Sequence, residues 1–582
     1  MILLFERKIL IFSEMKKGPY LMKRLLTEAG EKLNGIPWNR YPRPQMVREK
    51  WLCLNGIWKL TSGDKTSDIL VPFCPESLLS GMQWVPEYGQ EMIYERTFII
   101  PDSWEGKRIL LHFGAVSRIS DVAVNGEKIV HHEESYYPFS ADITNHLVTG
   151  DNTLSVTVIN DVSHNHPWGK QKIDRGGMWY TPVSGIWQTV WLEPVPEQYI
   201  HSLSIQTDLD RVHIQAAGID TGTLSLDGET YPIRNGSVNI SIKAPRHWSP
   251  EDPYLYHFEI RTNNDSIRSY FALRTLSTEH VNGFPRLCLN GKPYFFHGLL
   301  DQGYWSDGLY TPADSFGFER DIKAMKALGF NTLRKHIKIE PEQFYYDCDR
   351  LGMIVFQDMV NCGDYHFFSD TILPTVGFLR KNDRNLNPNE RIRFNFLSSM
   401  ERTVQLLSNH PCVCLWTVFN EGWGQFRADE AYDKLKSLDN SRFIDSTSGW
   451  FQQHKSDVES LHIYFRKLHP GKGDKPLLLS EIGGWSCKIP DHSFNQKKTY
   501  GYRKYTDRSV FIKDLRRLYL EQVLSLISKG LCGTIYTQLS DVEDETNGLL
   551  TYDRRVLKIS PEEFADIAVL LQNAAREIGH SL

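Results

Sequence analysis

The sequence predicts a protein in three parts, two all-β sandwiches followed by a (β/α)8 barrel. The chain of 582 residues is too long for one hydrophobic core. Short runs of alternating apolar and polar residues fill its first half, and from about residue 281 apolar runs alternate with helical patterns. We place the parts at residues 41–196, 197–280 and 281–582, after an N-terminal extension of residues 1–40.

The N-terminal extension resembles neither a signal peptide nor a membrane anchor. Its apolar stretches are interrupted by Glu6, Arg7, Lys8 and Glu14, and no small-residue cleavage site follows an apolar core. An appended amphipathic helix, or a start upstream of the natural one at Met22, fits better. No run of about 18 uncharged apolar residues occurs anywhere, so we expect no membrane span and a cytoplasmic protein.

The two β parts are predicted from alternation and turns. Runs such as RTFIIP (96–101), RILLHFG (108–114) and NTLSVTVIN (152–160) alternate with period two, and Asn125-Gly126 is a hairpin turn signal. The second part repeats the pattern over a length near that of an immunoglobulin-like domain. Both parts are therefore expected to be antiparallel sandwiches.

The barrel is predicted from eight strand candidates that alternate with helical segments over about 290 residues. An open doubly wound sheet is the alternative, but no Gly-rich phosphate loop opens the first unit. The eight candidates are PYFFHGLL (293–300), FNTLRKH (330–336), MIVFQD (353–358), CVCLWTVFNE (412–421), RFIDST (442–447), SLHIY (460–464), PLLLSE (476–481) and GTIYTQLSD (533–541).

Two of these apolar strands end in a glutamate, Glu421 and Glu481. In a barrel the C-terminal ends of the strands surround the active site, so both carboxyls are expected to face its mouth. A pair of carboxyls that flanks one bond is what glycoside hydrolysis requires. A salt bridge to a neighbouring strand would explain one such glutamate, but explains two of them poorly.

Composition and motifs exclude several other functions. The net charge of −5 comes from mixed charges and gives no basic field for nucleic acid. The nine cysteines are irregularly spaced, which argues against a disulfide framework. Cys412 and Cys414 lie inside an apolar run and are interpreted as core residues, and no HExxH or paired CxxC motif occurs. We therefore predict no metal and no cofactor.

Five long motifs resemble glycoside hydrolase family 2, the family of β-galactosidases, β-glucuronidases and β-mannosidases, over roughly residues 41–560. The resemblance implies a jelly-roll sugar-binding sandwich, an immunoglobulin-like sandwich and a catalytic TIM barrel. The motifs, in the family's order, are RGGMWYTPVSGIWQTVWLEP (175–194), HWSPEDPYLYHFEI (247–260), LGFNTLRKHIKIEPEQFYYDCDRLGMIVFQDM (328–359), NHPCVCLWTVFNEGWG (409–424) and LLLSEIGGW (477–485).

The same resemblance implies the roles of five residues. Glu421 is similar to the family's general acid/base, and Glu481 to the nucleophile of a retaining double displacement. Asn420 resembles the residue that binds the sugar 2-hydroxyl. Tyr464 resembles a tyrosine that donates to the nucleophile, and Arg334 an arginine that keeps it ionised.

Further cleft residues are predicted because they lie at strand ends or just beyond. The alternative is packing in a surface loop for Asp301, and packing or support of other cleft residues for the rest. These residues are His336, Asp301, Asp358, His462, Trp423 and Trp485.

The sequence departs from the family where the sugar would be recognised. Glucuronidases of the family read the substrate carboxylate with an Asn-x-Lys element near the last strand, and the corresponding stretch 541–554 has no lysine. Its acidic residues Asp541, Glu543, Asp544 and Glu545 would repel a uronate. Neutral sugars, and β-galactosides before others, are therefore expected, with loops 361–390 and 485–510 setting the aglycone preference.

We thus expect a retaining exo-β-glycosidase that takes an oligosaccharide or glycoside and binds neither nucleic acid nor membrane, with a homo-oligomer left open. The same scaffold would suit a β-mannosidase, a β-glucosidase, an α-L-arabinosidase or a β-glucuronidase. From another class, the chain could be a carbohydrate-binding protein without activity. The presence of both Glu421 and Glu481 argues against that alternative.

Overall fold

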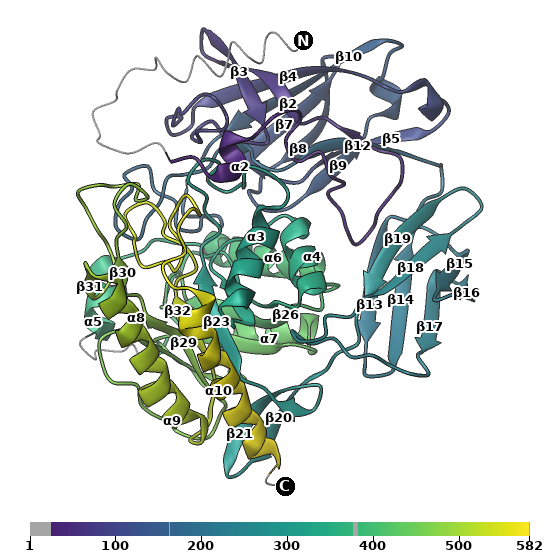
Figure 1. Ribbon diagram of the computed structural model, residues 1–582. Helices are drawn as coiled ribbons and strands as arrows, with labels where there is room; N and C mark the ends of the chain where they lie inside the picture. The colour runs from purple at the N-terminus through teal and green to yellow at the C-terminus, as the bar shows by residue number, and fades with distance from the viewer. Residues whose placement is uncertain (1–24, 162, 376–381, 581–582) are drawn as a thin grey trace.

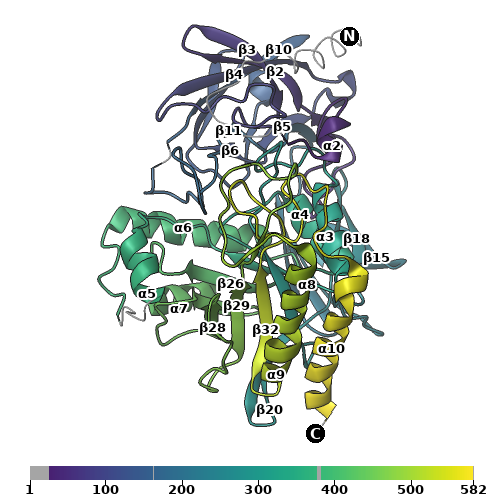
Figure 2. The same ribbon diagram turned by 60° about the vertical axis from the view of Figure 1, so that its left-hand side comes forward.

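The fold is described from a computed structural model that covers residues 25–161, 163–375 and 382–580. The two interpretations of the N-terminus, an appended amphipathic helix or a start upstream of the natural one at Met22, concern residues 1–24, which lie outside the described residues. Figures 1 and 2 show the first sandwich above the barrel, the second sandwich at the side of the barrel, and the C-terminal helix running down its outer surface. Within the described residues no helix is both long and apolar enough to cross a membrane.

The first sandwich consists of a six-stranded sheet in the order β3-β2-β4-β10-β7-β8, a four-stranded sheet β1-β12-β5-β9 and the short pair β11-β6. Alternating side chains of the two main sheets enclose a core that includes Trp58, Tyr94 and Phe113. Its strands are β1 (Leu52–Cys53), β2 (Gly56–Ser62), β3 (Lys65–Val71), β4 (Glu91–Ile99), β5 (Arg108–Phe113), β6 (Val116–Ser117), β7 (Ile119–Val124), β8 (Glu127–His132), β9 (Phe139–Asp142), β10 (Asp151–Ile159), β11 (Gly185–Ile186) and β12 (Val190–Val195).

The second sandwich is built from seven antiparallel strands joined in the order β13-β14-β17-β16-β15-β18-β19. These strands are β13 (Ser202–Thr207), β14 (Arg211–Ala217), β15 (Thr221–Leu226), β16 (Glu229–Arg234), β17 (Ser237–Ser241), β18 (Tyr256–Arg261) and β19 (Ser266–Phe271). A small antiparallel sheet then leads into the barrel, formed by β20 (Leu276–Val281), β21 (Phe284–Leu289) and β22 (Lys292–Pro293).

All eight predicted barrel strands are present and parallel, in the order β27-β26-β25-β24-β23-β32-β29-β28. They are β23 (Phe296–Asp301), β24 (Thr332–Lys335), β25 (Ile354–Asp358), β26 (Val413–Asn420), β27 (Phe443–Ser448), β28 (Glu459–Ile463), β29 (Leu477–Gly483) and β32 (Leu531–Thr537). β27 and β28 lie next to each other, and their Ser448 and Ser460 hydroxyls are 3.3 Å apart. The barrel is thus nearly closed.

The prediction of eight strand–helix units was wrong for the fifth and sixth units. Loops, without any helix, connect β27 to β28 and β28 to β29 through fully described residues. The first loop is too short to hold a helix with a turn at each end. The second contains Pro470, Gly471, Gly473 and Pro476, which disfavour a helix.

Helices cover the rest of the barrel. They are α3 (Gly317–Ala327), α4 (Glu342–Leu351), α5 (Leu373–Thr375), α6 (Glu390–Leu407), α7 (Ala428–Leu438), α8 (Arg508–Arg517), α9 (Leu524–Ile527) and α10 (Pro561–His580), with the π-helical segments η3 (Phe368–Ile372) and η4 (Leu518–Val523). Outside the barrel lie α2 (Glu28–Glu31), the 3₁₀ turns η1 (Asp102–Trp104) and η2 (Thr144–His146), and the short strands β30 (Ser486–Cys487) and β31 (Lys504–Tyr505) near the barrel mouth.

The first sandwich covers the end of the barrel where the strands terminate (Figure 2). Buried polar contacts hold the two parts together. The Trp168 indole donates to the Gly363 carbonyl at 3.0 Å, and the Tyr137 hydroxyl contacts the Ser399 hydroxyl at 2.6 Å. The sandwich therefore contributes side chains to the space above the strand ends.

Candidate active site

A pocket opens at the C-terminal ends of the barrel strands. The strand ends form its floor, and segments from outside the strands form its walls. The lining residues are Lys170, Met178, Leu300, Gln302, His336, Asn420, Glu421, Trp423, Tyr464, Glu481, Tyr500, Gly501, Tyr502, Thr537, Glu545 and Asn547.

Glu421 follows the last residue of β26 and enters this pocket with an unusual backbone. Its φ is +50°, in the left-handed region that residues with a side chain seldom adopt. Such strain is typical of functional sites, where the surrounding structure holds it in place. One carboxyl oxygen lies 2.7 Å from His462 Nδ1 and accepts from the Tyr464 hydroxyl at 3.3 Å.

Glu481 lies within β29 and is surrounded by donors. Its carboxylate accepts from the Tyr464 hydroxyl at 2.7 Å, from the Thr537 hydroxyl at 3.2 Å and from Arg334 Nη1 at 3.3 Å. Burial alone would raise the pKa of this carboxyl, but attraction to His462 and Arg334 prevails and lowers its pKa to about 2. Glu481 is thus held in its ionised form.

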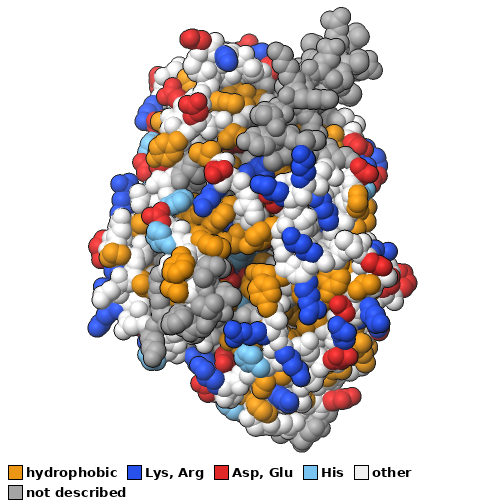
Figure 3. All heavy atoms as spheres, turned by 90° about the vertical axis from the view of Figure 1, so that its left-hand side faces the viewer, with side chains coloured by type: hydrophobic (Ala, Val, Ile, Leu, Met, Phe, Trp, Pro, Cys, Tyr) orange, Lys and Arg blue, Asp and Glu red, His pale blue; other side chains and the backbone are white. Residues whose placement is uncertain are grey.

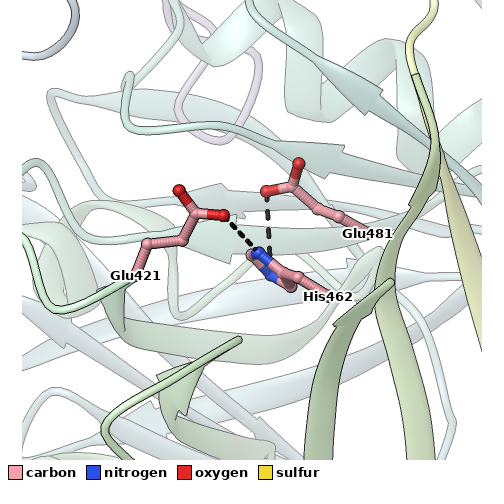
Figure 4. A group of neighbouring side chains, drawn as sticks. All are labelled: Glu421, His462 and Glu481. Carbon is pink, nitrogen blue, oxygen red and sulfur yellow. Dashed lines mark hydrogen bonds and ion pairs between the residues drawn. The ribbon is translucent and has the colours of Figure 1, made fainter. Parts of the chain in front are cut away.

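His462 and Tyr464 connect the two glutamates, as Figure 4 shows for the histidine. The His462 ring contacts Glu421 through Nδ1 at 2.7 Å and approaches Glu481 through Nε2 at 3.7 Å. Ligand atoms of these three residues lie within 4.8 Å of one another, the spacing of a metal site. The Arg334 guanidinium beside the same atoms disfavours a cation there.

A buried layer supports the pocket floor. Arg334 on β24 donates to Asp358 at 2.9 Å and to the Asn420 side chain at 2.8 Å. His336 Nδ1 lies 2.7 Å from the other Asp358 oxygen. Burial lowers the pKa of His336 to about 4, so the ring is neutral near pH 7. Asn420 and His336 line the pocket, whereas Arg334 and Asp358 act on it from behind.

Of the predicted cleft residues, Asp358 and His462 support the pocket without lining it, and Asp301 and Trp485 do neither. Asp301 is paired with Lys335 at 2.6 Å and accepts from the Gly303 amide, beneath the pocket. Trp485 packs in the barrel core against Tyr505 and is not among the pocket-lining residues. We correct both, because strand-end position alone does not determine which way a side chain points. Trp423 does line the pocket.

The structure adds residues that strand ends could not indicate. Lys170 and Met178 come from the loop between β10 and β11 of the first sandwich, and Glu545 and Asn547 from the loop after β32. In the sequence, Lys170 was signalled only by the family-like motif at 175–194, which follows a few residues later, and Glu545 by its place in the acidic stretch 541–545.

The acidic stretch 541–545 is largely neutralised. Asp541 is paired with Lys558 at 2.6 Å, and Glu543 with Arg175 at 3.0 Å. Asp544 accepts from the Asn495 amide at 2.7 Å. Of the four acids only Glu545 lines the pocket. The acidic field expected from the sequence is therefore reduced at the pocket to one carboxyl.

Three family models match consecutive segments of the chain. They are described as "Glycosyl hydrolases family 2, sugar binding domain" (79–196), "Glycosyl hydrolases family 2" (198–274) and "Glycosyl hydrolases family 2, TIM barrel domain" (282–476). The chain belongs to glycosyl hydrolase family 2. The matched barrel segment contains Glu421 but ends before Glu481, so the position of Glu481 in the site rests on the geometry above.

Two curated relatives within this family carry different activity names. The chain is 26% identical over 458 residues to a β-galactosidase of Lactococcus lactis, covering 72% of this chain and 42% of the relative. It is 26% identical over 437 residues to a β-glucuronidase of Chlorocebus aethiops, covering 65% and 63%. The chain thus spans less than two thirds of the length of these relatives.

A solved structure, of a β-D-glucuronidase from Dictyoglomus thermophilum, shares the fold. Its TM-score is 0.71 at 19% sequence identity, and the alignment covers 92% of this chain and 98% of that one. At this identity the likeness shows the multidomain architecture only.

Proposed function

We propose that the chain is a retaining exo-β-glycosidase that uses Glu481 as nucleophile and Glu421 as general acid/base. The observation that carries the proposal is the pairing of the two carboxyls across one pocket, with ligand oxygens within 4.8 Å of each other. Carboxyls of retaining enzymes are about 5 to 5.5 Å apart, and those of inverting enzymes about 6.5 to 9.5 Å.

The unequal surroundings of the two acids support the assignment of roles. Glu481 receives the Arg334 guanidinium and two hydroxyl donors, which favour the charged form that attacks an anomeric carbon. Glu421 is bound by His462 and Tyr464, which act as donors or acceptors as its protonation changes. Environments that differ in this way are typical of acid and nucleophile pairs.

The walls of the pocket support action on a terminal sugar. Segments from the first sandwich and from the loops around Tyr500 and Glu545 surround the space above the two acids. Such a pocket accepts the end of a glycan more readily than its middle. Asn420, whose side-chain oxygen accepts from Arg334 at 2.8 Å, lines this pocket and in this proposal contacts a sugar hydroxyl beside the anomeric carbon.

Two classes of sugar remain as candidates. The sequence favoured a neutral sugar, β-galactosides first, because of the acidic stretch and the absent lysine. Pairing of that stretch with Lys558 and Arg175 weakens the electrostatic part of this reasoning. Lys170 in the pocket favours the second class, β-linked uronic acids.

Aryl β-glycosides, combined with alanine substitution of each acid, test the proposal. We expect Glu481→Ala and Glu421→Ala each to lower turnover by several orders of magnitude. Azide should restore turnover in both, with an inverted glycosyl azide from Glu481→Ala and a retained one from Glu421→Ala. Inversion at Glu421→Ala instead would reverse the roles. Full activity in either variant would refute the proposal.

A further inference from the structure

Lys170 brings a positive charge into the pocket from outside the barrel. Lys170 lies in the loop between β10 and β11, and only 8% of its surface is exposed. Its backbone carbonyl accepts from the Tyr180 amide at 2.9 Å, which fixes the loop where the side chain departs. The side chain lines the same pocket as Glu481, Glu545 and Asn547.

The Lys170 ammonium has no hydrogen bond or ion pair with any residue in the described part of the chain. Its nearest recorded partners are the rings of Tyr180 and Trp423, with the ammonium 5.7 Å from each ring centroid. Rings at this distance offset part of the cost of desolvating a cation, but they do not supply a counter-ion. The carboxylates of Glu481 and Glu545 lie close enough to feel the charge of Lys170 but form no hydrogen bond with it, so its ammonium hydrogens are available to a bound anion.

The charge of Lys170 acts on the groups that face the sugar. Burial raises the pKa of Glu545, and Lys170 opposes this rise without cancelling it. A raised pKa favours the protonated carboxyl, which repels a neighbouring anion less and can donate a hydrogen bond to it. The Asn547 side chain, which also lines the pocket, offers a neutral amide beside Glu545.

We propose that Lys170 is a specificity-determining residue that binds the carboxylate of a β-linked uronic acid in this pocket. The inference rests on the proposed glycosidase function and selects between its two candidate sugar classes. The lysine that residues 541–554 lack is supplied by the first sandwich. An ammonium is well suited to this role, because it forms charge-assisted hydrogen bonds to a carboxylate and weaker ones to a hydroxyl.

A neighbouring lysine provides a matched control. Lys172 lies two residues further along the same loop, and its ammonium stacks over the Trp179 ring at 4.4 Å. It is only half-buried and is not among the pocket-lining residues. Lys172→Met therefore removes the same charge from the same loop without changing the pocket. Lys170→Arg tests whether a positive charge alone suffices.

The test uses pairs of substrates that differ only at C6, 4-nitrophenyl β-galactoside against the β-galacturonide and the β-glucoside against the β-glucuronide. We expect the wild-type chain to prefer one uronide over its neutral partner. Lys170→Met should lower the ratio of kcat/KM for uronide to neutral sugar by at least about 30-fold, since removing one partner of a buried charge pair typically costs that much or more. Lys172→Met should leave the ratio unchanged, and Lys170→Arg should keep part of it.

Calorimetric titration with free galacturonate, glucuronate and galactose separates this proposal from the proposed function, because it needs no turnover. Binding of a uronate that Lys170→Met abolishes, without hydrolysis of any glycoside, would refute the glycosidase function and support the anion site. Preference for neutral sugars in both assays, or a uronide preference equal in wild type and Lys170→Met, would overturn the role of Lys170. A thermal unfolding midpoint of Lys170→Met near that of Lys172→Met shows that the fold is kept.

Discussion

Removing the charge of Arg334 should move the ionisation of the proposed nucleophile into the measurable pH range. The lowering of the Glu481 pKa from 4.5 to about 2 corresponds to about 3 kcal/mol in favour of the carboxylate. A unit charge at the 3.3 Å distance between Arg334 Nη1 and Glu481 Oε1 contributes about 5 kcal/mol at an effective dielectric constant of about 20. Attraction to His462 remains without Arg334, so the Glu481 pKa should rise towards its ordinary value.

The assay is the pH dependence of kcat/KM, which reports the pKa values of the free enzyme. Glu481 should set no acid limb above about pH 3 in the wild type, and Arg334→Met should introduce one that approaches pH 4.5. Arg334→Lys keeps the charge and should restore a lower limb. Because Arg334→Met also leaves Asp358 with His336 but without its guanidinium partner, profiles are measured well below each variant's unfolding temperature. If kcat/KM fell at the same acidic pH in Arg334→Met and Arg334→Lys, the charge of Arg334 would not set the Glu481 pKa.

Three further predictions follow from single contacts. Glu421→Gln should nearly abolish hydrolysis of substrates with poor leaving groups but spare glycosylation by dinitrophenyl glycosides, which need no acid; equal losses for both would contradict the acid role. Tyr464→Phe removes a 2.7 Å hydrogen bond to Glu481 and should lower kcat/KM about 10- to 100-fold in steady-state kinetics, and a change below twofold would show that the contact is dispensable. Asn389→Ala removes the N-cap of α6, whose side chain accepts from Arg391 N and Ile392 N, and denaturant unfolding should show a loss of about 1 kcal/mol with turnover unchanged.

The lowered Glu481 pKa also has a consequence for folding stability. A carboxyl whose pKa is lower in the folded than in the unfolded state contributes stability above the unfolded value. For Glu481 this contribution is complete above about pH 4.5 and is lost as the pH falls towards 2. Glu481→Gln should therefore flatten the dependence of the unfolding free energy on pH in that window.

Apolar periodicity predicted the barrel strands because a strand buried on both faces must be almost wholly apolar. For the same reason the polar residues Glu421 and Glu481 stood out at their ends. The absence of helices after β27 and β28 was not predicted, because regularly spaced strands suggest complete strand–helix units. Loop length and Pro or Gly content decide whether a helix forms. The short connection after β27 and the Pro-rich one after β28 illustrate this.

Lys170 could not be predicted as part of the site, since its position depends on how two separate domains pack. The contacts that fix this packing, such as that between Trp168 and Gly363, join residues far apart in the sequence. The prediction that Asp301 lines the cleft was wrong for a local reason. Asp301 lies at the end of a barrel strand as expected, but it is paired with Lys335 on the next strand and does not line the pocket. Strand-end position narrows the candidates, and charge pairing decides among them.

The most direct test of the account is to trap the covalent glycosyl-enzyme with a 2-deoxy-2-fluoro β-glycosyl fluoride of the preferred sugar and to map it by peptide mass spectrometry. We expect one added sugar, located on Glu481, and slow recovery of activity when an acceptor is added. A label on Glu421 would contradict the assigned roles. Hydrolysis that releases the inverted sugar, with no labelled peptide, would contradict the double displacement itself.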